Sequence, residues 1–130
     1  MFNQKILLNE SGFTLVEIIA VLVILSVLAA VAVPRYVDLE ENARQKAIGT
    51  AISEINAREK ITWADAKIST SGFVSDAKIF GEINYELDPN YVWKSGDPTV
   101  AGGTLKFQGE SFTLSRSASA IFKPAVWKQK

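Results

Sequence analysis

The sequence predicts an α+β fold in which a long N-terminal α-helix packs against a small antiparallel β-sheet of about four strands. Two observations support this prediction. An apolar run near the N-terminus leads directly into an amphipathic stretch with helical spacing. After Ile79, short runs of aromatic and β-branched residues are separated by Gly, Pro, Asn and Asp, which is typical of strands joined by turns.

The composition narrows the range of functions. The chain has 130 residues, enough for one small domain plus one extra element. Lysine and arginine total 14, and so do aspartate and glutamate, so the sequence lacks the basic excess of a nucleic-acid partner and none is predicted. Cysteine and histidine are absent, which removes disulfides, thiolate sites and the commonest general base. We therefore predict a protein that is not an enzyme and has no metal or cofactor.

The first predicted element is a hydrophobic helix over residues 13–34. Residues 13–33 form an apolar run of 21 residues in which Glu17 carries the only charge. As a helix this run would be roughly 32 Å long, enough to cross a bilayer core of about 30 Å. The run is rich in Val and Ile, but in lipid the need to satisfy every backbone hydrogen bond favours a helix.

Two simpler interpretations explain only part of this segment. A secretory signal peptide would explain the apolar run, and residues 29–32 resemble a cleavage site, but the run is long and residues 1–12 carry only Lys5 as a basic side chain. A plain membrane anchor explains the length but not Glu17. A carboxylate within a membrane helix costs about 2–3 kcal/mol and usually has a partner.

Residues 12–17 read GFTLVE and follow a short polar leader. This junction resembles the processing site of type IV prepilins. The resemblance implies a cleaved leader over residues 1–12, removed by a prepilin peptidase that cuts after Gly12 on the cytoplasmic side. Phe13 would then become the N-terminal residue and be methylated on its amine, and Glu17 would be the fifth residue of the mature chain.

The same resemblance implies partners and a location. The new ammonium group of Phe13 and the Glu17 carboxylate of a neighbouring subunit would be costly alone in an apolar environment and less costly together. The expected partners are identical subunits in a helical polymer, the prepilin peptidase, an assembly platform in the inner membrane, and membrane lipid before assembly. The chain would cross the inner membrane once, with a cytoplasmic leader and a periplasmic globular part, before joining an extracellular filament.

Pro34 marks the end of the apolar run, and residues 35–68 are predicted to continue the helix in amphipathic form. Ile48, Ile52 and Ile55 follow the i, i+4, i+7 spacing of one apolar face. The helix is predicted to end near Lys67. By resemblance, Pro34 occupies the position of a proline in many pilins, which makes it a second assembly residue, and residues 34–44 resemble mannose-sensitive haemagglutinin-type pilins.

Residues 69–130 are predicted to form the antiparallel sheet and loops of a pilin-like globular domain. The clearest hairpin joins residues 105–108 to residues 111–114 through a Gly109-Glu110 turn of type II′, so that Phe107 faces Phe112. A second hairpin is predicted between residues 83–87 and 91–94, and residues 121–122 are a candidate edge strand. The aromatic residues of this region are expected to form its core.

Three functions from different classes fit these observations. The favoured one is a structural type IV pilin subunit. A pseudopilin of a type II secretion system would use the same N-terminus, and a monomeric membrane-anchored binding protein would be neither cleaved nor polymerised. Whether the filament serves adhesion, motility, DNA uptake or electron transfer is left open by the sequence.

Overall fold

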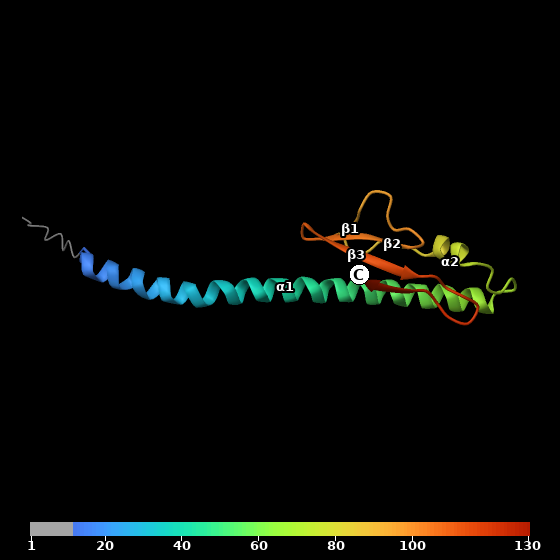
Figure 1. Ribbon diagram of the computed structural model, residues 1–130, viewed down its shortest axis with the longest axis horizontal. Helices are drawn as coiled ribbons and strands as arrows, with labels where there is room; N and C mark the ends of the chain where they lie inside the picture. Colours follow the sequence, from blue (N-terminus) through green and yellow to red (C-terminus); the bar gives the residue numbers. More distant parts are fainter. Residues whose placement is uncertain (1–11) are drawn as a thin grey trace, which may run out of the picture. The chain divides into compact units, whose positions relative to one another are not determined.

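The computed structural model describes residues 12–130. Except for Gly12, the predicted leader, with Lys5, therefore lies outside the described residues. The chain divides into two compact units, Met1–Glu40 and Glu41–Lys130. The described elements, shown in Figure 1, are the helices α1 (Leu15–Ile68) and α2 (Asp76–Glu82) and the strands β1 (Tyr91–Trp93), β2 (Gly102–Phe107), β3 (Glu110–Ser117) and β4 (Val126–Gln129).

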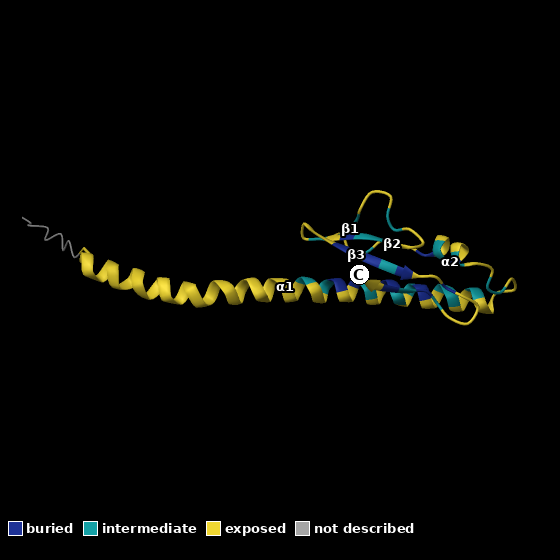
Figure 2. Cartoon of the chain, viewed as in Figure 1, coloured by how far each residue is buried: buried dark blue, intermediate teal, exposed yellow. Residues whose placement is uncertain are grey.

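The helix α1 is continuous through Pro34 and ends one residue after the predicted Lys67. In the first unit, every described residue up to Glu40 is exposed, including all its Leu, Ile and Val side chains (Figure 2). Among the described helices, α1 alone is long and apolar enough to cross a membrane by length and composition. The predicted hydrophobic helix is thus present, and no other described part of its own unit buries its apolar side chains.

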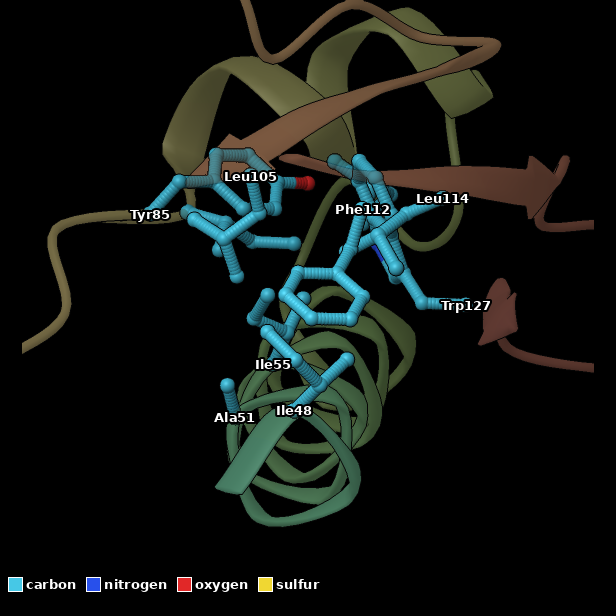
Figure 3. Packing of buried hydrophobic residues seen from close by; sticks show 10 residues of the cluster. Ile48, Ala51, Ile55, Tyr85, Leu105, Phe112, Leu114 and Trp127 are labelled. Carbon is cyan, nitrogen blue, oxygen red and sulfur yellow. The ribbon is translucent and has the colours of Figure 1, made fainter. Parts of the chain in front are cut away.

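The second unit confirms the predicted α+β fold. Its four strands form one antiparallel sheet in the order β1-β2-β3-β4, so each strand pairs with the next along the chain. One face of the sheet packs against α1, and Figure 3 shows the helix residues Ile48, Ala51 and Ile55 pointing toward that face. The buried cluster consists of Ile48, Ala51, Ile55, Ile79, Ile83, Tyr85, Leu105, Phe112, Leu114 and Trp127.

The predicted hairpin is present, but its turn and register differ from the prediction. The turn residues are Gln108 and Gly109, both with positive φ (49° and 85°), as a type I′ turn requires. Consequently Leu105 pairs with Phe112. The two registers differ by two residues, and a shift of two leaves every side chain on the same face. The apolar pattern could not distinguish between them.

Two other predicted strands are wrong. Residues 83–87 are not a strand, because β1 pairs with β2 instead, and their backbone oxygens accept side-chain bonds, such as Arg58 Nη1 to Asn84 O at 2.6 Å. Residues 121–122 form a turn, and the edge strand is β4, which begins after Pro124. The short helix α2 was not predicted, although Ser75 caps it by accepting a bond from the Lys78 N–H.

A buried ionic network ties the elements of this unit together. Glu59 on α1 is fully buried, and its Oε1 accepts bonds from Arg116 Nε (2.5 Å), Tyr85 Oη (2.9 Å) and Trp127 Nε1 (2.8 Å). Arg116 on β3 also bonds Asp76 at the start of α2, with Nη1–Oδ2 at 2.8 Å and Nη2–Oδ1 at 2.9 Å. Burying these charges is tolerable because each is paired and hydrogen-bonded.

Hydrogen bonds and ion pairs in this network favour the charged forms of Asp76 and Arg116. Partial burial of Asp76 opposes ionisation, but hydrogen bonds from Arg116 and Ser119 lower its pKa to about 2. Burial likewise opposes the charge of Arg116, yet its bonds to Glu59 and Asp76 raise its pKa. Burial and the Glu59 carboxylate raise the pKa of Tyr85, so its hydroxyl remains a donor.

We predict that Arg116→Met lowers the free energy of unfolding by about 3–5 kcal/mol, because the Glu59 carboxylate would stay buried without its cation. Urea unfolding of the purified chain in detergent, followed by tryptophan fluorescence, measures this loss. Lys106→Met, which removes an exposed cation from β2, is the matched control and should change stability by less than about 0.5 kcal/mol. Equal stability of the two variants would contradict the prediction.

A pH dependence follows from the lowered pKa of Asp76. A carboxyl group with a depressed folded-state pKa contributes stability above its unfolded pKa, near 3.8, and loses it as the pH falls toward about 2. We expect the chain to lose stability between about pH 5 and pH 2. Asp76→Asn should be less stable at pH 7 and should lose less stability over that interval, measured by urea unfolding at each pH. Parallel pH profiles would refute this role for Asp76.

Candidate functional site

The candidate site is the N-terminus of α1, where sequence analysis placed the processing junction. Gly12 and Phe13 precede the helix, and the Phe13 side chain is 84% exposed. A Cβ built on Gly12 would meet nothing within 4 Å, and Gly12 is not among the glycines with positive φ. Among the residues that the structure describes, neither packing nor backbone conformation requires a glycine at this position.

Thr14 and Glu17 form a reciprocal cap on the first turn. The Thr14 hydroxyl oxygen accepts a bond from the Glu17 N–H at 3.2 Å. In return, Glu17 Oε2 accepts bonds from the Thr14 N–H at 2.7 Å and from the Thr14 hydroxyl at 3.0 Å. This is a capping box, which satisfies helix-terminal N–H groups that have no partner within the helix.

The cap fixes the position of the Glu17 carboxylate. Both bonds from Thr14 end on the same oxygen, Oε2, and the carboxylate lies beside the positive end of the helix dipole. All three bonds involve residues after Phe13, so removal of residues 1–12 would leave the cap intact. The sequence signal for this cap was the threonine three residues before Glu17, which sequence analysis did not use.

Pro34 does not join this group. It lies 17 residues after Glu17 in the same helix, about 26 Å along the axis at the α-helical rise. Within the described residues there is no group of three or more His, Cys, Asp or Glu side chains arranged to hold a metal ion. The site thus offers one carboxylate, that of Glu17, held in position near the Gly12–Phe13 peptide bond in an otherwise apolar segment.

Comparison with known proteins agrees with this geometry. Residues 7–33, which include the junction and the apolar run, match the family described as prokaryotic N-terminal methylation motif. The chain is similar to type IV pilus proteins. It is 28% identical over 109 residues to PilA5, the type IV narrow pilus major component of Thermus thermophilus, a match that covers 84% of this chain and 90% of that protein. No solved structure matches.

The alignment with PilA5 extends over parts of both units of the chain. The methylation motif covers the start of α1, whereas the 109 aligned residues also extend over most of the globular unit. The narrower resemblance of residues 34–44 to mannose-sensitive haemagglutinin-type pilins stays a prediction.

Proposed function

We propose that this pilin-like chain is a structural subunit of a type IV pilus, inserted in the inner membrane as a prepilin and polymerised through α1. The observation that carries the proposal is the combination of an uncovered apolar helix with one capped carboxylate in its first turn. The leader 1–12 would be removed, residues 13–34 would form the membrane or filament-core helix, and residues 35–68 would connect it to the globular unit formed with residues 69–130.

The exposed apolar side chains of the first part of α1 would be stabilised by burial against lipid or other subunits. Each Val, Leu or Ile side chain gains about 1.5–3 kcal/mol on full burial, and those of residues 15–33 are between 46% and 78% exposed. Lipid covers them in the precursor, and identical helices would cover them in a filament. Because the run is apolar on all sides, it can be surrounded by several neighbours at once, as a helical polymer requires.

Glu17 would then guide the approach of the next subunit. A carboxylate in an apolar filament core is costly unless a cation pairs with it. Cleavage after Gly12 would create such a cation, the ammonium group of Phe13, which stays positively charged when it is subsequently methylated. Thr14 holds Glu17 Oε2, so the carboxylate is already oriented in the free subunit. The pairing of this carboxylate with the amine of a neighbouring copy would set the axial register.

The other proposed partners follow from the same site. A prepilin peptidase on the cytoplasmic side would recognise the junction, which would explain a glycine that the fold does not require. An assembly platform in the inner membrane would extract the cleaved subunit into an extracellular filament. The relative from Thermus thermophilus is a major pilus component, and we propose a similar structural role here.

The first test removes the charge of Glu17. We expect Glu17→Ala to insert in the membrane normally but to lower the yield of sheared filaments at least about tenfold, because the register-setting pair is lost. Glu17→Gln keeps a side chain that can cap the helix but has no charge. It therefore separates helix capping from charge pairing, and we expect it to lower the filament yield as much as Glu17→Ala does. Asp38→Ala, on the same helix, is the control and should assemble. Normal filaments from Glu17→Gln would rule out charge pairing.

The second test concerns the junction. We expect Gly12→Val to leave the globular unit folded but to block cleavage, so that mass spectrometry of the membrane fraction finds a chain retaining residues 1–12. The unaltered chain should begin at Phe13 with a methylated amine. If the unaltered protein from filaments retains its leader, the proposed processing is wrong.

A further inference from the structure

The loop between β3 and β4 displays an aromatic side chain to solvent. Ala120 and Lys123 exchange backbone hydrogen bonds of 2.8 and 3.2 Å and enclose a tight turn with Ile121 and Phe122 at its tip. Phe122 is 90% exposed and Ile121 is 49% exposed. Turn tips are usually occupied by Gly, Asn, Asp or Ser, so two large apolar residues here need a reason other than turn formation.

Side chains of α1 hold this turn in place. Trp63 Nε1 donates to Ala120 O at 2.8 Å, and Lys67 Nζ donates to Ile121 O at 2.8 Å. The Lys67 ammonium group also lies 5.5 Å from the centre of the Phe122 ring and 5.6 Å from that of Trp63. Phe122 therefore projects from a fixed support, and we call Ile121 and Phe122, held by these two side chains, the knob.

An open hollow of about 260 Å³ lies on another side of α1. It is lined by Arg58, Ile61 and Thr62 of α1, by Glu82 at the end of α2 and by the two residues that follow it, Ile83 and Asn84. Ile61 forms an apolar wall that is 61% exposed. Arg58 is held in the wall by hydrogen bonds to Asn84 O (2.6 Å) and Glu86 O (2.7 Å), so its guanidinium plane is fixed. A cavity of about 150 Å³ accommodates benzene, so the hollow has room for one aromatic ring.

The knob and the hollow lie on opposite flanks of α1. Successive residues of an α-helix are rotated by about 100° around its axis. By this rotation, the mean direction in which Trp63 and Lys67 leave the axis of α1 is about 170° from that of Arg58, Ile61 and Thr62. Figure 1 agrees, because the loop before β4 and the helix α2 lie on different sides of the green end of α1. A subunit with the knob on one flank and the hollow on the other cannot fill its own hollow, but it can fill that of a second copy.

The charges of the two flanks are complementary. The exposed lysines Lys60 and Lys67 of α1 share the knob flank, where Lys123 adds a third cation. On the hollow flank α1 places Glu54 and Asp65, and Glu82 lines the hollow. That flank also carries two cations: Arg58, which is paired with Glu54, and Lys78, which lines a neighbouring hollow together with Asp65 and Glu82. The acidic residues named on the hollow flank outnumber its two cations, so its net charge is opposite in sign to that of the lysine-bearing knob flank.

From these observations we propose that Phe122 of one subunit inserts into the hollow beside Ile61 and Arg58 of the next subunit in the filament. The Phe122 ring would contact Ile61 and the face of the Arg58 guanidinium. The contact uses two different surfaces, so it is heterologous and can propagate without closing into a dimer. The inference rests on the proposed polymer and adds a contact between globular units to that of the N-terminal helices.

Cysteine crosslinking in filaments tests the contact, since the chain has no cysteines of its own. We expect filaments of the full chain carrying both Phe122→Cys and Ile61→Cys to give a ladder of disulfide-linked multimers on non-reducing gels. The matched pair Val92→Cys with Ile61→Cys, which uses an exposed valine of β1, should give none. Intact filaments without a ladder, or equal ladders from both pairs, would overturn the proposal, as would efficient dimers from Phe122→Cys alone.

A second measurement covers the case in which the cysteine pair does not assemble. Phe122 is replaced by the photoreactive analogue p-benzoylphenylalanine, which keeps the aromatic ring, and irradiated filaments are digested and mapped. Crosslinks to residues 58–62 or 82–84 of another copy support the contact, and crosslinks elsewhere refute it. If the unaltered chain forms no filaments, the proposed function itself fails; if it does and the crosslinks map elsewhere, only this inference fails.

Discussion

The globular unit depends on one buried carboxylate. Glu59 sits on the sheet-facing side of α1 and accepts hydrogen bonds from β3, from β4 and from the segment after α2. A buried carboxylate without partners is strongly disfavoured, so α1 and the strands must meet in an arrangement that brings Arg116 and Trp127 to it. Apolar contacts alone would tolerate sliding between the helix and the sheet, whereas these directional bonds would not. The network thus selects one packing in a small domain that has no disulfides.

The single helix α1 has two kinds of surface along its length. Up to Val33, α1 is apolar on all sides and its side chains are exposed within their own unit. After Glu41, one side of the helix carries Ile48, Ala51 and Ile55 into the core, and the remaining sides carry charges. The helix continues through Pro34 although that residue has no N–H to donate, so one secondary-structure element joins the apolar segment to the amphipathic segment.

Most of the fold could be predicted from local patterns, and the errors share a cause. The spacing of Ile48, Ile52 and Ile55 correctly predicted the packed face of α1. The hairpin was placed correctly but shifted by two residues, because Leu105 and Phe112 keep their faces in either register and the choice depended on the turn at Gln108. Residues 83–87 have a strand pattern, but Arg58 and Trp93 use their carbonyl groups for side-chain contacts.

By itself, the sequence determined the helix, its apolar N-terminal segment and the α+β class, and it predicts a processing junction at Gly12 and Phe13, because these features depend on residues close together in the chain. Only the tertiary structure decided which distant groups meet. Glu59 and Arg116 are 57 residues apart, as are Trp63 and Ala120, and no periodicity links them. The buried network and the supported knob therefore became visible only once the sheet had packed on α1, since long-range pairing is set by packing and hydrogen-bond satisfaction rather than by local propensity.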